Sequence, residues 1–367
     1  MLNRRELLKL SGMTALGLMA TQRRAISADV SRPEIKVAGY SYDRVQAIKD
    51  GVVGLDLADV TFHDENIYRL NDLAFGPEKT YEVTELGLIP YVTKYINDGF
   101  RDYTLIPVFI SRTFRHRNIY VHVDSGIEKP EDLRGKRVGT PGYGSSANTW
   151  IRGMLHDQYG VAAGDIQWIE TTKSSDIKGT VSSSSGTGSR YQLADDFPLV
   201  QGPPGVDESE LLLSGGCDAL ITPITPRAYV EGNPKIRQLF TSLKSAEQKY
   251  FRDTGIFPIM HVVAVRADTA RDYPRLPVEV FRMYSEAKQA AYTNLATTTA
   301  LRTSLPWVAE EYEETRKIMG DDYWRYGIEA NRKELDLVMR YTYEQGLVKR
   351  LGEFKDMFHP GTLSLQG

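Results

Sequence analysis

The chain has 367 residues, of which 41% are hydrophobic and 25% are charged, and its formal net charge at pH 7 is −3. This composition is ordinary for a globular protein, and the mildly acidic balance argues against nucleic acid or an anionic membrane as a partner. A single cysteine, Cys217, excludes an internal disulfide.

The first residues have the pattern of a twin-arginine export signal. Arg4 and Arg5 are followed by a leucine pair and Lys9, and then by an apolar stretch over residues 10–20. That stretch is shorter than the ~20 residues that a membrane-spanning helix needs. We therefore expect residues 1–28 to be a cleaved signal peptide, with no membrane anchor left after cleavage and export to the periplasm by the twin-arginine route. Their removal would leave 40 Lys and Arg against 47 Asp and Glu, a net charge of −7.

Short apolar runs then alternate with helical patterns. Strands are predicted at 35–40, 59–63, 81–86, 104–111, 118–124, 137–140, 166–171, 218–222 and 261–266. Helices are predicted at 42–48, 66–73, 89–98, 147–159 and 207–214, and from Pro277 onward only helices follow, at 278–295, 306–319 and 330–344. The alternation predicts an α/β architecture with mostly parallel sheets, followed by a C-terminal helical layer.

The length after the signal exceeds what one hydrophobic core usually organises, so two lobes are expected. We assign residues 29–117 and 267–367 to lobe one and residues 118–266 to lobe two. Residues 173–205 include a stretch rich in Ser, Gly and Pro, which predicts a loop. A loop of this length is either functional, for example a lid over a site, or an inert surface excursion.

Several motifs resemble known families. Residues 127–139, Ile-Glu-Lys-Pro-Glu-Asp-Leu-Arg-Gly-Lys-Arg-Val-Gly, and 216–223, Gly-Cys-Asp-Ala-Leu-Ile-Thr-Pro, resemble the second lobe of type II periplasmic binding proteins. Residues 106–116, Ile-Pro-Val-Phe-Ile-Ser-Arg-Thr-Phe-Arg-His, and 253–261, Asp-Thr-Gly-Ile-Phe-Pro-Ile-Met-His, resemble the 4,5-dihydroxyphthalate decarboxylase family, which shares that fold. The second resemblance runs from about residue 35 to about residue 363. It implies a two-lobed type II periplasmic-binding-protein-like fold with a ligand cleft between the lobes.

Two segments are candidates for binding an anion. Residues 142–149 form the predicted loop that opens a helix, where free backbone N–H groups and the helix dipole favour negative charge, although a serine there can simply cap the helix. Arg112 and Arg115 follow an apolar strand, where ligands of open α/β sheets bind, and two guanidinium groups could hold a dicarboxylate. The alternative for these arginines is a solvated basic run paired with acidic residues.

The expected ligand-binding residues are Tyr42, Asp43, Arg44, Arg112, Arg115, Tyr143, Ser145, Ser146, Asn148 and Thr222. If the chain is an enzyme, the catalytic candidates are His261, His116 and Glu85, because protonation of a ring carbon needs an acid. A lone histidine at the start of an apolar strand is also compatible with a structural role.

Two functions remain open from sequence. The first is a periplasmic solute-binding protein that delivers a small anionic, aromatic carboxylate to a membrane permease in ABC-type transport. The alternative, which the resemblance implies, is an exported enzyme of the 4,5-dihydroxyphthalate decarboxylase type that releases CO2. The six histidines show no metal-ligand spacing and no nucleotide motif is present, so we predict no metal and no cofactor, and we expect a monomer.

Overall fold

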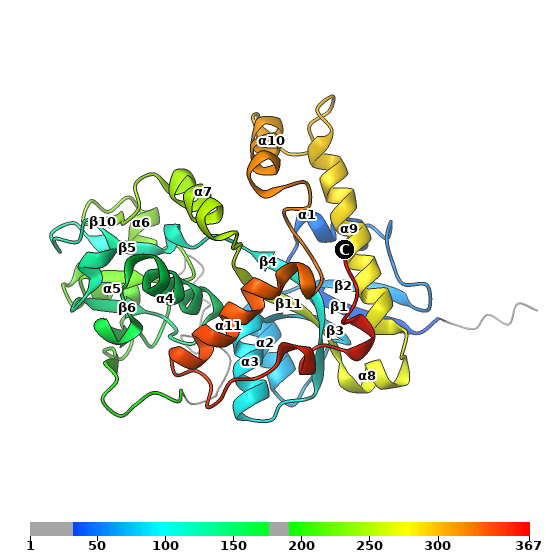
Figure 1. The fold of residues 1–367 in the computed structure, drawn as a ribbon, viewed down its shortest axis with the longest axis horizontal. Coiled ribbons are helices and arrows are strands. Elements are labelled where there is room, and N and C mark those ends of the chain that lie inside the picture. Colours follow the sequence, from blue (N-terminus) through cyan, green and yellow to red (C-terminus); the bar gives the residue numbers. More distant parts are fainter. Residues whose placement is uncertain (1–31, 176–190) are drawn as a thin grey trace, which may run out of the picture. The chain divides into compact units, whose positions relative to one another are not determined.

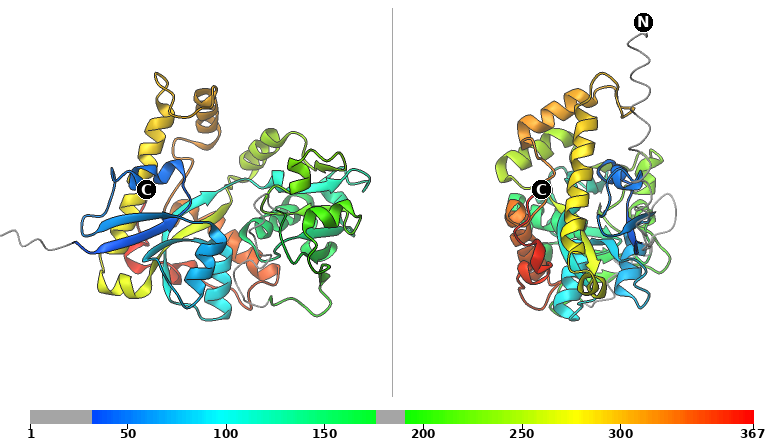
Figure 2. Two further views of the ribbon diagram at one scale, coloured as in Figure 1. Left: turned by 180° about the vertical axis from the view of Figure 1, so that it is seen from behind. Right: turned by 90° about the vertical axis from the view of Figure 1, so that its right-hand side faces the viewer.

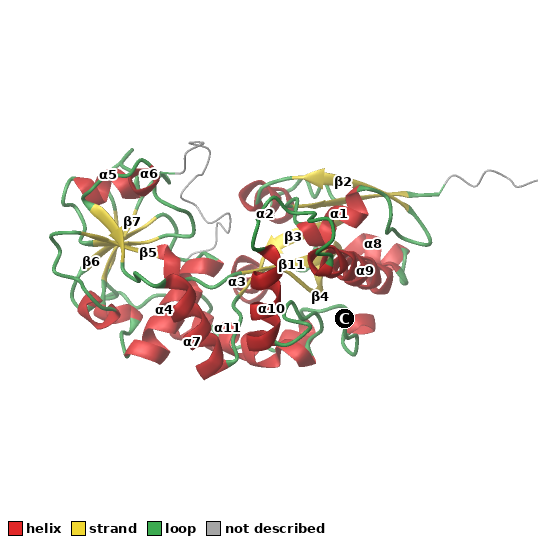
Figure 3. Cartoon of the chain, turned by 90° about the horizontal axis from the view of Figure 1, so that it is seen from above, coloured by secondary structure: helices red, strands yellow, loops and turns green. Residues whose placement is uncertain are grey.

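The computed structural model describes residues 32–175 and 191–367, which contain two β-sheets with helices around them (Figure 1; Figure 3). The predicted signal peptide, residues 1–28, lies outside the described residues. Residues 34–367 form one compact unit. Within the described ranges, no helix combines the length and the apolar character needed to cross a membrane.

The first sheet belongs to lobe one. Its strands are β1 (Glu34–Gly39), β2 (Asp59–Asp64), β3 (Val83–Gly87), β4 (Tyr103–Arg112) and β11 (Ile259–Arg266). They lie in the order β2-β1-β3-β11-β4. Strands β1, β2 and β3 are parallel, whereas β11 runs antiparallel to both β3 and β4.

The second sheet belongs to lobe two. Its strands are β5 (Ile119–His122), β6 (Arg137–Thr140), β7 (Gln167–Glu170), β8 (Leu199–Gln201), β9 (Ala219–Ile221) and β10 (Ile236–Gln238). They lie in the order β10-β5-β9-β6-β7-β8, with β5 antiparallel to β9 and β10 and the remaining pairs parallel. Both sheets are therefore mixed: five of the nine strand pairs are parallel and four are antiparallel.

Helices connect the strands and form the C-terminal layer. Those of lobe one are α1 (Asp43–Lys49), α2 (Ile67–Phe75), α3 (Leu88–Asn97), α8 (Ala267–Asp272), α9 (Leu276–Ala296), α10 (Val308–Met319) and α11 (Arg332–Glu344). Those of lobe two are α4 (Ser146–Tyr159), α5 (Glu208–Leu213), α6 (Arg227–Val230) and α7 (Leu243–Thr254). Figure 2 shows α9 in yellow beside the first sheet, where it contacts α1 and β4.

The predicted strands and helices are all present, and the two-lobed α/β class is confirmed. Two corrections concern lobe two. Residues 259–266 were expected at its end, but they form β11 and pair with β3 and β4, so they belong to lobe one. The predicted loop 173–205 contains β8, which pairs with β7, while its residues 176–190 lie outside the described residues. The other lobe boundaries stay predictions.

The start of helix α4 is one candidate anion site. The residues that cap α4 at its two ends explain where this helix begins and ends. The Ser145 side chain accepts a hydrogen bond from the backbone N–H of Asn148, which satisfies one of the free donors at the start of the helix. At the other end Gly160 has φ of 65°, a left-handed conformation that glycine adopts without a Cβ penalty.

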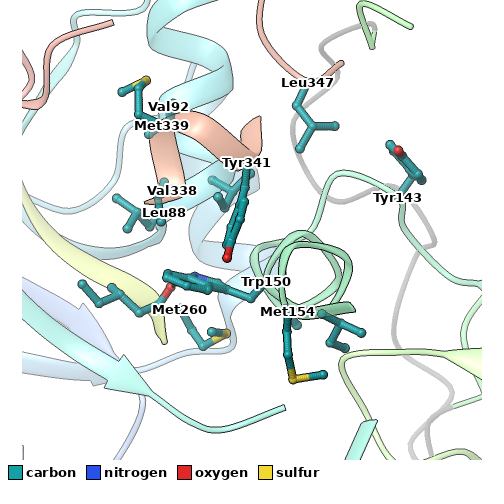
Figure 4. Close-up of a cluster of buried hydrophobic side chains, with 14 of the residues drawn as sticks. Leu88, Val92, Tyr143, Trp150, Met154, Met260, Val338, Met339, Tyr341 and Leu347 are labelled. Carbon is teal, nitrogen blue, oxygen red and sulfur yellow. Dashed lines mark hydrogen bonds between the residues drawn. The ribbon is translucent and has the colours of Figure 1, made fainter. Parts of the chain in front are cut away.

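One hydrophobic core extends from α3 across α4 to α11 (Figure 4). Trp150 of α4 faces Tyr341 of α11, with the ring centroids 5.5 Å apart and nearly perpendicular. The Trp150 indole N–H also donates to the carbonyl of Ile259 in β11 at 2.9 Å. A Cβ at Gly153 would clash with the Tyr341 ring, so glycine permits this close approach of the two helices. Buried aromatic packing thus fixes the start of α4 relative to lobe one.

Candidate functional site

A small cavity of about 70 Å3 gathers polar side chains from both lobes. Lobe one supplies residues from α2, the β3–α3 junction, the end of β4 and the start of β11, and lobe two supplies the start of α4 and the residue after β9. The lining residues are Ile67, Tyr68, Asn71, Gly87, Pro90, Arg115, Ser145, Ser146, Ala147, Pro223, Met260 and His261. Four predicted site residues, Arg115, Ser145, Ser146 and His261, therefore meet at one place.

A larger groove of about 720 Å3 runs along α11, but its chemistry is different. Among its charged residues, Arg332 is paired with Glu329, and Arg340 is paired with Glu344 and Asp157. Its arginines therefore already have carboxylate partners within the protein. We place the candidate site at the smaller cavity, where the cation has no such partner.

Arg115 is a partly buried cation whose hydrogen-bond acceptors are all neutral. Its guanidinium donates to Sδ of Met260 at 3.2 Å, to Oδ1 of Asn118 at 3.3 Å and to the carbonyl of Pro223 at 3.2 Å. Burial lowers the pKa of Arg115 to about 10, so the group still carries its charge at neutral pH. No carboxylate is found among its partners in residues 32–175 and 191–367. A guanidinium in this state favours an anionic ligand.

His261 is held by a buried carboxylate on the neighbouring strand. Its Nδ1 lies 2.5 Å from Oε1 of Glu85, which is 1% exposed. The same carboxylate accepts the Tyr42 hydroxyl at 2.8 Å and the Tyr40 backbone N–H at 3.0 Å. A Cβ at Gly39 would lie 2.9 Å from Glu85 Oε2, so glycine leaves room for this approach. With Nδ1 engaged by Glu85, Nε2 is the ring nitrogen left for another partner.

The N-terminus of α4 forms the opposite wall. Ser145 caps the helix, and Oγ of Ser146 accepts the backbone N–H of Ile89 at 3.2 Å. Both serines line the cavity, where the positive end of the helix dipole adds to the charge of Arg115. The predicted capping role of Ser145 is therefore present, while the binding of an anion by this segment stays a prediction.

Arg112, predicted to bind ligand, has instead a structural environment. Its five N–H groups all find acceptors inside the protein: the carbonyl of Phe257 twice, the carbonyl of Arg325, Oδ1 of Asn331 and Oε1 of Glu334 at 2.8 Å. Its side chain is fully buried, and burial lowers its pKa to about 10. No donor is left for a ligand, so the predicted pair of arginines is reduced to Arg115.

His116 and Tyr143 are also removed from the candidate site, because both are buried in aromatic clusters. The His116 ring packs edge-on against Phe240 and Tyr250, and burial lowers its pKa to about 4. The Tyr143 ring packs edge-on against Trp168 and also contacts two other aromatic rings. Neither residue lines the cavity, and a neutral buried His116 is a poor proton donor.

The residues of the Tyr42-Asp43-Arg44 segment do not line the cavity. Tyr42 contacts Glu85, as described above. The Arg44 guanidinium is stacked between the rings of Tyr42, at 4.0 Å, and Trp324, at 3.9 Å, and it donates to the carbonyl of Ile110. Asp43 is exposed and paired with Arg44. These residues support the site and do not contact its interior.

Asn148 and Thr222 brace the backbone near the cavity without lining it. The Asn148 amide donates to Oγ1 of Thr140 and to the carbonyl of Gly142, which fixes the loop before α4. Thr222 is buried, and it precedes Pro223, whose carbonyl accepts from Arg115. Both residues therefore hold neighbouring backbone in place and do not themselves face the cavity.

Sequence reasoning did not select several lining residues, among them Tyr68, Asn71 and Met260. Asn71 and Tyr68 lie on α2, inside an amphipathic pattern that carries no motif. Tyr40, whose ring stacks on His261 with centroids 6.0 Å apart, was also missed. Its position at the end of β1 was the available signal, because side chains at strand ends face ligand sites in α/β proteins.

No group of three or more His, Cys, Asp or Glu side chains suited to a metal ion occurs in the described part of the chain. The polar groups of the cavity are one guanidinium, one imidazole, hydroxyls and one amide, which suit an organic anion.

Comparisons with known proteins agree with the motifs. A family model described as NMT1/THI5 like matches residues 109–186. The 4,5-dihydroxyphthalate decarboxylase of Comamonas testosteroni is 33% identical over 339 residues, which cover 91% of this chain and 98% of that protein. The 4,5-dihydroxyphthalate decarboxylase of Pseudomonas putida is 31% identical over 228 residues, which cover 61% of this chain and 83% of that protein.

Among solved structures, the periplasmic aliphatic sulphonate binding protein SsuA of Escherichia coli is similar, with a TM-score of 0.48 and 14% identity over 89% of this chain and 97% of that chain. The two sheets, each with helices around it, agree with the two-lobed α/β class that the sequence predicts. The identity and coverage of the Comamonas testosteroni protein decide the family. This chain belongs to the 4,5-dihydroxyphthalate decarboxylase family.

Proposed function

We propose that this protein binds a small aromatic dicarboxylate in the cavity around Arg115 and removes one carboxylate as CO2, with His261 as the proton donor. The observation that carries the proposal is the pairing of His261 with Glu85 at 2.5 Å beside a guanidinium that has no carboxylate partner among the described residues. The names of the family relatives supply the substrate class, 4,5-dihydroxyphthalate.

Each element of the cavity has a role in this chemistry. Arg115 would hold the carboxylate that is retained, because its planar fork forms charge-assisted bonds with carboxylate oxygens. The N-terminus of α4 at Ser145 and Ser146 adds further positive potential. Glu85 acts through His261: it fixes the ring orientation and stabilises the protonated imidazole.

The reaction balances without a redox partner. In 4,5-dihydroxyphthalate each carboxylate has a ring hydroxyl para to it, and this hydroxyl pushes electrons towards the carbon that bears the carboxylate. That carbon takes the proton from the His261 imidazolium, the carbon–carboxylate bond then breaks, and its electron pair restores the aromatic ring. The products are CO2 and a dihydroxybenzoate, and His261 regains a proton from solvent.

The cavity must widen when such a ligand binds. Its volume of about 70 Å3 is well below the roughly 300 Å3 at the lower end of ligand pockets. The aromatic contact between α4 and α11 holds the two lobes together on one side. We therefore expect the cavity to open between its lobe-one wall at α2 and its lobe-two wall at Pro223 while that contact stays in place.

The test is turnover of 4,5-dihydroxyphthalate by the purified chain without residues 1–28. We expect His261→Gln to lower kcat by about 10²- to 10⁴-fold, the usual contribution of a positioned general acid, while ligand still binds. His156→Gln is the matched control, since His156 lies half-exposed in the last turn of α4. The proposal is contradicted if the wild type does not release CO2, or if both variants keep wild-type turnover.

A second candidate is binding without chemistry, in which the protein passes the ligand to a membrane permease. The pattern of Arg4, Arg5 and the apolar residues after them favours it, because an exported protein of this fold suits solute capture. Thermal stabilisation by ligand that is recovered unchanged would support this candidate.

Location is a separate part of the proposal: cell fractionation should recover the chain in the periplasm, and recovery with cytoplasmic markers would contradict export.

A further inference from the structure

A tyrosine outside the cavity makes direct contact with the carboxylate that holds His261. The Tyr42 hydroxyl donates to Oε1 of Glu85 at 2.8 Å, and the same oxygen faces Nδ1 of His261 at 2.5 Å. The side chain of Ser111, at the end of β4, hydrogen-bonds the Tyr42 hydroxyl in turn. One carboxylate oxygen is therefore shared between a phenol and an imidazole.

The phenol can only act as the donor in this contact. Burial and the charge of Glu85 raise the pKa of Tyr42 far above its ordinary value, so its hydroxyl keeps the proton. The Arg44 guanidinium lies over the Tyr42 ring at 4.0 Å, and Trp324 covers the other face of the guanidinium at 3.9 Å. A cation over the ring draws electron density from the phenol and makes it a stronger hydrogen-bond donor.

Other ionisable groups also surround the pair. From the elements packed against it they are Tyr40 directly after β1, Arg44 of α1, Tyr68 of α2, Arg115 after β4, Tyr284 of α9, and Tyr326. Tyr40 differs from Tyr42 in one respect: its hydroxyl accepts the backbone N–H of Ile67 and does not reach Glu85. Tyr42 is thus the side-chain hydroxyl that contacts the carboxylate.

We propose that Tyr42 is a positioning residue that sets how tightly the Glu85–His261 pair holds its proton. This inference rests on the proposed function. The Tyr42 hydroxyl spreads the charge of the Glu85 oxygen, which weakens the hold of that oxygen on the imidazolium. Without the hydroxyl, the negative charge is more concentrated, and His261 gives up its proton less readily.

The alternative is that Tyr42 only contributes to folding, as other buried tyrosines do. Tyr103 is the matched control, because its hydroxyl is also buried in lobe one and donates to the carbonyl of Tyr81 at 2.7 Å. Tyr42→Phe and Tyr103→Phe each delete one hydroxyl together with its hydrogen bonds, and each keeps the ring. Only the first deletion touches Glu85.

The experiment measures kcat and KM against pH for the wild type, Tyr42→Phe and Tyr103→Phe. For Tyr42→Phe we expect kcat to fall about tenfold with KM nearly unchanged, since Tyr42 does not line the cavity. The alkaline limb of the kcat profile should move up by about one pH unit, the effect of losing one hydrogen bond to a charged group. The same profile for both variants would overturn the inference.

A second readout does not depend on turnover. In protein labelled with 15N-histidine, the His261 ring signals, assigned by their loss in His261→Gln, are followed by NMR against pH. We expect their titration to move to higher pH in Tyr42→Phe and to stay in place in Tyr103→Phe. If the wild type shows no turnover but this shift occurs, the proposed function fails and the role of Tyr42 on the pair stands. If turnover occurs and the shift is absent, the role of Tyr42 fails alone.

Discussion

Arg112 is the last residue of β4 and Arg115 follows it three residues later, yet the two side chains have different environments. Burial lowers the pKa of each to about 10. Arg112 has Glu334 and a complete set of internal acceptors, whereas Arg115 has only neutral acceptors among the described residues and lines the cavity. The two arginines therefore differ in their partners: the protein supplies a carboxylate for Arg112, whereas the partners of Arg115 are neutral and its side chain lines a cavity.

The largest expected effect is on stability, at Arg112. Arg112→Met should lower the free energy of unfolding by about 3–5 kcal/mol, because the buried Glu334 then loses its 2.8 Å partner and keeps only the partly exposed Arg325, at 3.6 Å, as a cation. Urea unfolding measures this change. The double variant Arg112→Met with Glu334→Leu should recover most of the loss, since the pair is replaced by apolar groups. A loss below about 1 kcal/mol in the single variant would contradict the structural role.

Arg115→Gln should mainly lower the affinity for ligand, whereas Arg112→Met mainly lowers stability. We expect affinity for an aromatic dicarboxylate to fall about 10- to 100-fold, the value of a charge-assisted hydrogen bond, with a smaller effect on unfolding than at Arg112. Calorimetric titration measures the affinity. Arg117→Gln is the matched control, because the Arg117 side chain is 58% exposed and does not line the cavity. Equal affinities in the two variants would remove Arg115 from the site.

The expected effect at His116, which lies next to Arg115 but outside the cavity wall, is on the pH dependence of stability. Burial lowers the pKa of His116 from its ordinary 6.5 to about 4. Between these values the unfolded chain binds the proton and the folded chain does not, so this group makes stability fall as pH drops from about 6.5 to about 4. His116→Phe should flatten that dependence by about 1 kcal/mol per pH unit. Unfolding at several pH values measures it, and parallel curves would contradict the assignment.

The fold could be predicted largely because its strands are short apolar runs and its longer helices have an apolar face. Helix α7 was missed for a physical reason: its sequence, Leu-Lys-Ser-Ala-Glu-Gln-Lys-Tyr-Phe-Arg-Asp-Thr, buries only Tyr250 and so shows little apolar periodicity. Strand β8 was missed because it has three residues inside a segment of loop composition. The membership of β11 in the first sheet depends on pairing with β3 and β4, which a local pattern does not contain.

The sequence could predict which residue types form the site, but not which side chains they contact in the folded protein. Local rules selected Arg115, Ser145, Ser146 and His261, and the structure places all four in the wall of one cavity, while their predicted roles stay predictions. The same rules selected Arg112, whose carboxylate partner Glu334 lies 222 residues away in the chain. Tyr42 was predicted to contact the ligand. In the structure it does not line the cavity, and its hydroxyl donates to Glu85 instead.

The most direct test of the central claim is a single-turnover reaction of the purified chain with 4,5-dihydroxyphthalate labelled with 13C in both carboxylates. The account predicts one labelled CO2 per substrate molecule and a dihydroxybenzoate that keeps the other label, with the reaction strongly slowed by His261→Gln. Ligand that binds at the cavity and is recovered with both labels in place would contradict it.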